Sequence, residues 1–276
     1  MSNKKLTVPE FKALKAENRK FTMVTGYDYT MAQLLNESET EMILVGDSLA
    51  NIIMGESSTL PATMDIMIHH IRSVVKGAPT TFVVGDMPFG SYQTSKEQAI
   101  DSAVRMMKEG GCDCVKLEGG QNMAARIKAI VDTGIPVMGH IGMTPQSTAA
   151  LGGHGVQGKD TSVADKLLAD AKALDEAGVF SMVLECIPKG VAKRITEEVS
   201  ASTISCGAGA YCDGQNMNMY DLEGIFSDFV PKFVKHFAEV RGEMVGGLND
   251  YHTEVQAGSF PDDEHSYNAK VDGYEV

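Results

Sequence analysis

Short apolar runs of high β-propensity recur along the chain, and each ends in an acidic, imidazole or glycine position. The clearest begins at Met42 with four consecutive apolar residues and breaks at Gly46 and Asp47. A run that is apolar at every position is typical of a strand buried on both faces of a parallel sheet. The predicted strands are 21–28, 42–47, 80–86, 114–118, 135–140, 181–185 and 202–209, and the short polar segment 216–220 is a candidate for an eighth.

Segments with helical spacing separate these runs. In 94–111, Ser95 and Gln98 form a predicted capping box and Gly110 is the expected terminator. The segment 161–178 also has apolar residues on one helical face and also ends in glycine. Strand and helix alternate throughout the chain. Because parallel strands need crossover connections, this order predicts right-handed βαβ units around a parallel sheet.

Eight such units would close into a barrel, so the predicted fold is α/β, a (βα)₈ TIM barrel with extra N- and C-terminal helices at 8–18 and 229–244. An open doubly wound sheet is the lesser alternative. A length of 276 residues suits one barrel, and residues 1–276 are expected to form a single domain. Helices added to the ends of a barrel are expected to cover its bottom or to mediate oligomers.

Ionisable residues stand at the ends of five predicted strands. In a barrel these ends meet at the rim that holds the active site, so their side chains would point toward a substrate. Gathering them is costly unless a cation or ligand compensates their charge. Carboxylates without a histidine or cysteine cluster favour a hard cation such as Mg²⁺, and the two aspartates in VGD triplets are the natural pair. The five residues are Asp47, Asp86, Glu118, His140 and Glu185.

The spacing around these residues leaves several roles open. Lys116 and Glu118 alternate along one strand and therefore face the barrel interior together, where the lysine could be an ion-pair partner, a substrate clamp or a Schiff-base former. Glu185 ends an apolar run and is a candidate base for proton abstraction, with helix capping as the alternative. His140 is either a ligand or a hydrogen-bonded core histidine, and the second is the commoner case.

Charge and composition exclude several classes of protein. The chain has 24 basic and 37 acidic residues, a net charge of −13, so nucleic acid and acidic membranes are not expected partners. No apolar stretch suits a signal peptide or a membrane span, which predicts a cytoplasmic protein. The five cysteines contain no Cys-x-x-Cys pair, so reduced thiols are expected rather than disulfides or a zinc cluster.

Several motifs together resemble one enzyme family, ketopantoate hydroxymethyltransferase, in the right order and over nearly the whole chain. They are VGDSL (45–49), STLPATMD (58–65), GDMPFGSY (85–92), VKLEGG (115–120), GHIGMTPQS (139–147), VQG (156–158), LEC (184–186), GAG (207–209) and the tail PDDEHSY (261–267). The chain departs from the family pattern at His154 and Gly155, where a Tyr-Lys pair is common, and at Cys206.

The resemblance implies an activity and a set of site residues. A member of this family uses Mg²⁺, with 5,10-methylenetetrahydrofolate as co-substrate, to convert 3-methyl-2-oxobutanoate into 2-dehydropantoate on the route to pantothenate and coenzyme A. Members are homo-oligomers, commonly decamers built from pentameric rings. Carried over by motif, the metal ligands are Asp47, Asp86 and Glu118, the keto acid contacts are Asp47, Ser48, Asp86 and Lys116, and the base is Glu185.

Two other functions stay open at this point. A Mg²⁺-dependent lyase or mutase of the phosphoenolpyruvate mutase and isocitrate lyase group would resemble this family in fold and in binding an α-keto acid on Mg²⁺. The sequence lacks the catalytic cysteine loop expected of a lyase in that group. A non-catalytic barrel that binds a carboxylate metabolite would use the same strand-end acids for its metal alone.

Overall fold

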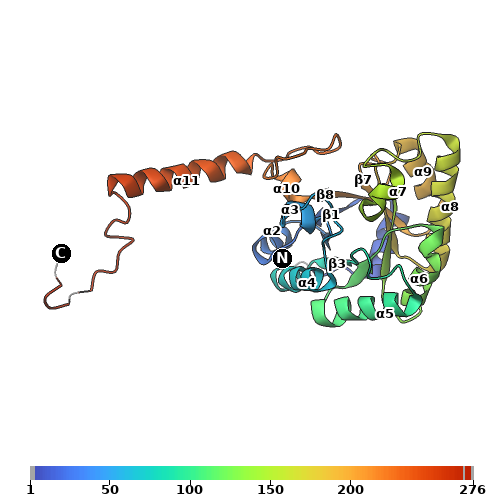
Figure 1. The fold of residues 1–276 in the computed structure, drawn as a ribbon, viewed down its shortest axis with the longest axis horizontal. Coiled ribbons are helices and arrows are strands. Elements are labelled where there is room, and N and C mark those ends of the chain that lie inside the picture. Colours follow the sequence, from blue (N-terminus) through green and yellow to red (C-terminus); the bar gives the residue numbers. More distant parts are fainter. Residues whose placement is uncertain (1–3, 270, 275–276) are drawn as a thin grey trace.

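The protein, described here by a computed structural model over residues 4–269 and 271–274, contains a closed barrel of eight parallel strands that follow one another in sequence order (Figure 1). Strand β8 pairs with β1 and closes the barrel. The predicted (βα)₈ barrel is confirmed. The strands are β1 (Phe21–Thr25), β2 (Met42–Val45), β3 (Phe82–Asp86), β4 (Cys114–Lys116), β5 (Val137–Gly142), β6 (Ser181–Glu185), β7 (Ser202–Cys206) and β8 (Gly214–Asn218).

Helices surround this barrel, and further helices lie near the N-terminus and the C-terminus of the chain (Figure 1). A π-helical turn, Met106–Gly110, continues α5, and a 3₁₀ turn, Pro145–Ser147, precedes α7. The helices are α1 (Val8–Ala16), α2 (Tyr29–Glu37), α3 (Leu49–Ile52), α4 (Met64–Gly77), α5 (Lys96–Arg105), α6 (Gln121–Val131), α7 (Thr148–Leu151), α8 (Thr161–Ala177), α9 (Lys189–Glu198), α10 (Met219–Leu222) and α11 (Val240–Ala257).

Only the strand at 181–185 has its predicted bounds, and the other seven differ by two or three residues at one or both ends. Strand β5 runs on to Gly142, so His140 lies within the strand and not at its end. The eighth strand occupies Gly214–Asn218 and therefore begins two residues before the predicted segment 216–220. Its side chains are mostly polar or half-buried, and its position is set by pairing with β1 along all five residues rather than by an apolar pattern.

The helix boundaries differ in two places. The C-terminal helix predicted at 229–244 is wrong, because α11 begins only at Val240 and the preceding stretch is irregular around Pro231, which lacks the N–H that a helix interior needs. In the fifth helix Ser95 caps as predicted, but the Gln98 side chain accepts from Thr94 N instead of completing the capping box. The left-handed cap is Gly111 and not Gly110.

Two apolar layers hold the barrel. The larger one lies between the outward faces of the strands and the surrounding helices. The smaller one joins inward-facing strand residues to α1. Phe11 of α1 is fully buried, with ring centroids 5.2 Å from both Phe21 and Phe82 and 6.5 Å from Phe180. Since these partners lie at the start of their strands, α1 closes the bottom of the barrel, as expected for an added N-terminal helix.

Polar contacts fix α1 in this position. Its first turn is closed by a capping box between Thr7 and Glu10. Near its end, Lys15 donates to the carbonyl oxygens of Thr196 (3.0 Å) and Ala201 (2.9 Å) and pairs with the Asp213 carboxylate at 3.2 Å. The helix is therefore tied to α9 and to the residues that directly precede β7 and β8.

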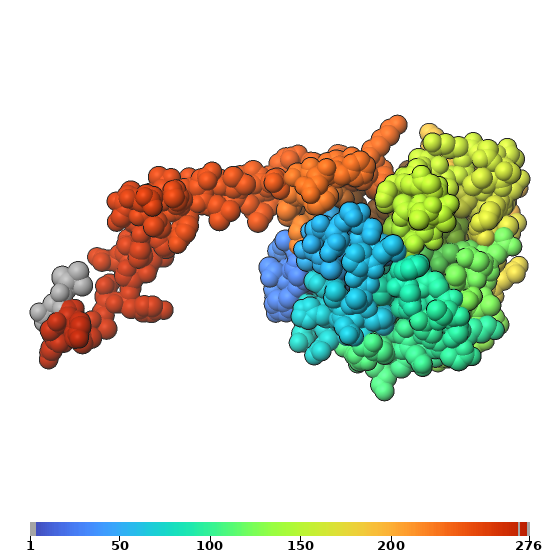
Figure 2. All heavy atoms as spheres, viewed as in Figure 1, coloured from blue at the N-terminus to red at the C-terminus, as the bar shows by residue number. Residues whose placement is uncertain are grey.

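The C-terminal helix α11 leaves the barrel and forms an arm that points away from it (Figures 1 and 2). No residue of α11 is buried. None of the described helices combines the length and the apolar character that crossing a membrane requires.

Replacing Phe11 with alanine should lower the free energy of unfolding by about 3–5 kcal/mol, because it removes a buried aromatic side chain and leaves a cavity among three other rings. Chemical denaturation followed by circular dichroism measures this change. Replacing the exposed neighbour Lys12 with alanine should change stability by less than about 0.5 kcal/mol. Equal effects of the two changes would show that the packing of Phe11 at the bottom of the barrel contributes nothing to the free energy of unfolding.

Candidate active site

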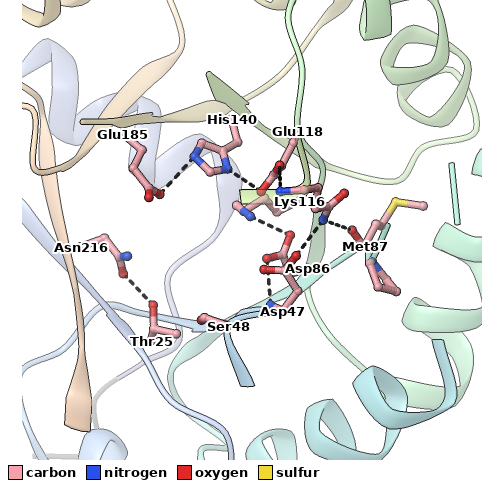
Figure 3. A network of polar contacts seen from close by, with 12 residues as sticks. Thr25, Asp47, Ser48, Asp86, Met87, Lys116, Glu118, His140, Glu185 and Asn216 are labelled. Atoms are coloured by element: carbon pink, nitrogen blue, oxygen red, sulfur yellow. Dashed lines mark hydrogen bonds and ion pairs between the residues drawn. The ribbon is translucent and has the colours of Figure 1, made fainter. Parts of the chain in front are cut away.

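The strand-end residues singled out from the sequence meet at the carboxyl end of the barrel (Figure 3). Asp86, Lys116 and Glu185 are the last residues of β3, β4 and β6. Asp47 and Glu118 lie in the loops directly after β2 and β4, where the parallel strands deliver them to the same rim. The barrel thus gathers carboxylates from four strands, β2, β3, β4 and β6.

A buried ion pair forms the centre of this group. Lys116 Nζ lies 2.7 Å from Asp86 Oδ1, and the two side chains are 4% and 1% exposed. The second carboxylate oxygen of Asp86 accepts from the backbone N of Asp47 at 3.1 Å. Burial lowers the pKa of Lys116, but the carboxylates of Asp86, Glu118 and Asp47 outweigh it and raise that pKa above its usual range. A permanently charged lysine suits a clamp for anions and not a Schiff base, which needs a neutral amine.

The Asp47 carboxylate is held in an unfavourable environment. It is almost fully buried, and desolvation together with the nearby charges of Asp86 and Glu118 raises its pKa well above the usual range. One oxygen of Glu118, Oε1, is buried and accepts no hydrogen bond in the described structure, with the His140 ring 3.4 Å away. Buried carboxylates that outnumber the neighbouring lysine and histidine, one of them with an oxygen that accepts no hydrogen bond, are the donor chemistry that a hard cation compensates.

The residues fit such a cation as a two-carboxylate site rather than as a preformed cage. Within residues 4–269 and 271–274, no three histidine, cysteine or acidic side chains converge closely enough to ligate one ion together. Mg²⁺ is usually bound through one or two carboxylates and keeps positions for water and substrate. Asp47 and Asp86 would be those ligands here.

His140 lies between the two remaining carboxylates. Its Nδ1 is 3.4 Å from Glu118 Oε1 and its Nε2 is 3.2 Å from Glu185 Oε2, and the imidazole is buried (Figure 3). Burial and the Lys116 charge lower the pKa of His140, but the flanking carboxylates raise it to about 9. In the metal-free protein these carboxylates favour the imidazolium form of His140, which lies in contact with the candidate base.

Gln146 organises the site and was not singled out from the sequence. Its Nε2 donates to Asp47 Oδ2 (2.9 Å) and to the Met87 carbonyl (3.0 Å), and its backbone N donates to Glu118 Oε2 (3.0 Å). Its Oε1 accepts from the hydroxyl of Tyr92 at 2.6 Å. The signal available in the sequence was its place in the motif after β5, where a polar side chain follows a strand that is otherwise buried.

The glycine-rich loop 152–158 and Cys206 border Glu185. Gln157 N in the loop donates to the carbonyl of Cys186, the residue after Glu185. Cys206 is the register partner of Glu185 on the adjacent strand, and burial raises the pKa of its thiol well above the usual range. All five cysteines are free thiols. Of the departures from the family pattern, Cys206 therefore lies directly beside the candidate base.

The family model for ketopantoate hydroxymethyltransferase matches residues 5–263 of the chain. The chain belongs to this family. It is 54% identical over 264 residues to the 3-methyl-2-oxobutanoate hydroxymethyltransferase of Heliobacterium modesticaldum, covering 96% of each chain. The enzyme of the same name from Clostridium beijerinckii is 53% identical over 272 residues, with 99% of this chain and 98% of that one covered. The chain is therefore a transferase.

Solved structures place the fold of this ketopantoate hydroxymethyltransferase family member beside a wider group of barrels. A phosphonopyruvate hydrolase, solved with oxalate and Mg²⁺, matches with a TM-score of 0.59 at 10% identity, covering 94% of this chain and 93% of that one. A 2,3-dimethylmalate lyase of the phosphoenolpyruvate mutase and isocitrate lyase superfamily matches with a TM-score of 0.58 at 13% identity, covering 94% and 91%. At these identities the likeness concerns the fold alone.

Replacing Asp47 with asparagine should stabilise the metal-free protein at neutral pH. Because the folded-state pKa of Asp47 is raised, its contribution to stability is lost as pH rises from about 4. Asparagine removes that penalty, so the melting temperature at pH 8 with a chelator should rise by about 2–4 °C, the shift given by about 1 kcal/mol in a chain of this size.

The matched control, Asp86 to asparagine, should act in the opposite direction. It leaves buried Lys116 without its carboxylate partner, which costs about 3–5 kcal/mol. Thermal melts of both variants with a chelator at pH 5 and pH 8 separate the two effects. Destabilisation by Asp47 to asparagine at pH 8 would contradict the electrostatic account of the site.

Proposed function

We propose that this protein transfers a hydroxymethyl group from 5,10-methylenetetrahydrofolate to 3-methyl-2-oxobutanoate and gives 2-dehydropantoate for pantothenate and coenzyme A biosynthesis. The observation that carries the proposal is that one rim holds two separate groups. One is a candidate base, Glu185, and the other is the buried ion pair of Asp86 and Lys116. Glu185 lies 3.2 Å from the His140 ring and its side chain is 15% exposed, while Asp86 and Lys116 are almost fully enclosed. Family membership supports the overall activity.

Asp47 and Asp86 are proposed to hold Mg²⁺, with Glu118 completing the ion's surroundings. When bound, the ion would supply a Lewis acid that polarises the keto group and stabilises the negative charge of an enolate. Lys116, which is charged and fixed by Asp86, and the hydroxyl of Ser48 would hold the keto acid. Both contacts favour an anionic substrate.

Glu185 is proposed to remove the proton from the carbon next to the ketone. It ends β6, so its side chain is delivered to the rim by a rigid strand. The His140 cation beside it orients the carboxylate and balances its charge before the proton is taken. The resulting carbon nucleophile would then form a bond to the one-carbon unit, water would supply the hydroxyl oxygen, and tetrahydrofolate would leave with its nitrogen protonated.

The rival functions have less support. A lyase or mutase of the phosphoenolpyruvate mutase and isocitrate lyase group is favoured by fold likeness alone, at identities of 9–15%. A barrel that only binds a carboxylate metabolite gives no reason for a cation beside a partly exposed glutamate. The cytoplasmic location stays a prediction from the sequence.

A homo-oligomer is proposed from the arm. Met244, Leu248, Tyr251 and Val255 are all exposed, with Leu248 at 67%, and their spacing places them on one side of α11. A second copy of the same chain is the proposed partner, because an exposed apolar stripe on a projecting helix needs a surface to cover it. The decamer that the family resemblance implies is one such assembly.

Replacing Glu185 with glutamine should abolish exchange of the C3 proton of 3-methyl-2-oxobutanoate, because the amide cannot accept it. Proton NMR in D₂O with Mg²⁺ follows this exchange, and calorimetry of the same variant should still show keto acid binding. Glu176 to glutamine, a change of an exposed glutamate on α8, should leave exchange unaltered. Full exchange by the Glu185 variant would overturn its assignment as the base.

Replacing Leu248 with aspartate should reduce the molar mass measured by size-exclusion chromatography with light scattering, because it places a charge in the apolar stripe. Asn249 to aspartate adds the same charge at the next residue and should leave the assembly intact. A monomeric wild-type protein would refute the proposed oligomer, whatever the variants do.

A further inference from the structure

Tyr27 is a buried residue behind the rim whose hydroxyl touches a predicted substrate contact. It follows β1, its side chain is fully buried, and burial raises its pKa above the usual range, so it stays protonated. Its hydroxyl lies 2.8 Å from Ser48 Oγ and 2.5 Å from Asn218 Nδ2. These three residues come from the carboxyl ends of β1, β2 and β8, and they form a chain of polar groups that leads to the barrel mouth.

The direction of the hydrogen bonds in this chain is fixed by Asn218. Its side-chain oxygen accepts from the backbone N of Tyr220 at 3.1 Å, where it caps α10. The amide NH₂ must therefore point at Tyr27, and an NH₂ group can only donate. The Tyr27 oxygen accepts this bond.

The Tyr27 proton then has one acceptor among the described residues, Ser48 Oγ. A buried hydroxyl without an acceptor would carry a desolvation penalty, so Tyr27 donates to Ser48. Ser48 uses a lone pair to accept, and its own proton remains available. Ser48 is half-buried next to Asp47, so this proton is free to face the barrel mouth.

We propose that Tyr27 and Asn218 are positioning residues that make Ser48 an obligate hydrogen-bond donor to a carboxylate oxygen of the keto acid. A carboxylate can only accept, whereas a free serine hydroxyl can present either its proton or a lone pair. The chain of bonds selects the first in advance of binding. This inference rests on the proposed function, because it takes the ligand at Ser48 to be the keto acid.

Replacing Tyr27 with phenylalanine should weaken binding of 3-methyl-2-oxobutanoate roughly three- to tenfold, since Ser48 is no longer held as a donor and a hydrogen bond to a charged group is weakened. Isothermal calorimetry in saturating Mg²⁺ measures the dissociation constant without turnover. In a Ser48 to alanine background, the same change should have no further effect. Tyr220 to phenylalanine is the matched control, because its ring packs 6.0 Å from that of Tyr27 but its hydroxyl contacts Asp28.

Replacing Asn218 with aspartate should reverse the chain of bonds. An aspartate accepts from Tyr27, so Ser48 must donate to Tyr27 and turn a lone pair toward the ligand, which should weaken binding more than tenfold. Adding Tyr27 to phenylalanine to this variant releases Ser48 and should strengthen binding. The Tyr27 change would thus weaken the wild type and strengthen the Asn218 variant, a change of sign that a packing defect or the added charge alone would not produce.

The outcomes separate the two levels of the proposal. Wild-type protein that does not bind the keto acid in Mg²⁺ would overturn the proposed function and this inference with it. Normal wild-type binding with equal losses from the Tyr27 change in the native, Ser48 to alanine and Asn218 to aspartate backgrounds would overturn the inference alone. The reversal of sign would establish it.

Discussion

The buried pair of Lys116 and Asp86 is the interaction on which the geometry of the rim depends. Removing two charges from water is costly, and a pair of this kind seldom stabilises a fold relative to apolar residues. The chain nevertheless places it among further acids, which raise the pKa values of both Asp47 and Lys116. A concentration of unfavourable charge in one part of an otherwise apolar barrel is typical of a functional site.

The opposite end of the barrel supplies the stability that this charge requires. Phe11 and the aromatic residues around it close the bottom, and Lys15 ties the same helix to α9 and to the residues that directly precede β7 and β8. The buried apolar side chains at the bottom leave the charged groups of the rim in a largely apolar barrel interior, where electrostatic interactions are stronger than in water. The apolar packing at the bottom of the barrel therefore offsets the energetic cost of the buried charges at its top.

Much of this arrangement could be predicted from the sequence, for a simple physical reason. Parallel strands deliver their last residues to one edge, so the runs that end in Asp86 and Glu185 place those side chains correctly without knowledge of the loops. Gln146 and Tyr27 were missed because their roles depend on the conformations of loops. The periodic pattern of apolar residues predicts strands and helices but not the conformation of a loop. The C-terminal helix was predicted at 229–244 and not at 240–257 because the observed helix contains adjacent glycines, Gly246 and Gly247, which lower helix propensity.

Hydrogen-bond direction separates the two halves of the rim. On one side, Asn218 forces a proton from Tyr27 toward Ser48, and Lys116 provides a fixed positive charge, so both groups there are ready for an anion. On the other side, His140 presents positive charge to Glu185 and leaves that carboxylate facing the site as an acceptor. An enzyme that removes a proton from a carboxylate-bearing substrate needs donors for the substrate carboxylate and a separate base for the proton. The two must be kept apart, because the negatively charged base and the substrate carboxylate repel each other. Holding the donors and the acceptor on different strands of a rigid barrel meets that requirement before the substrate arrives.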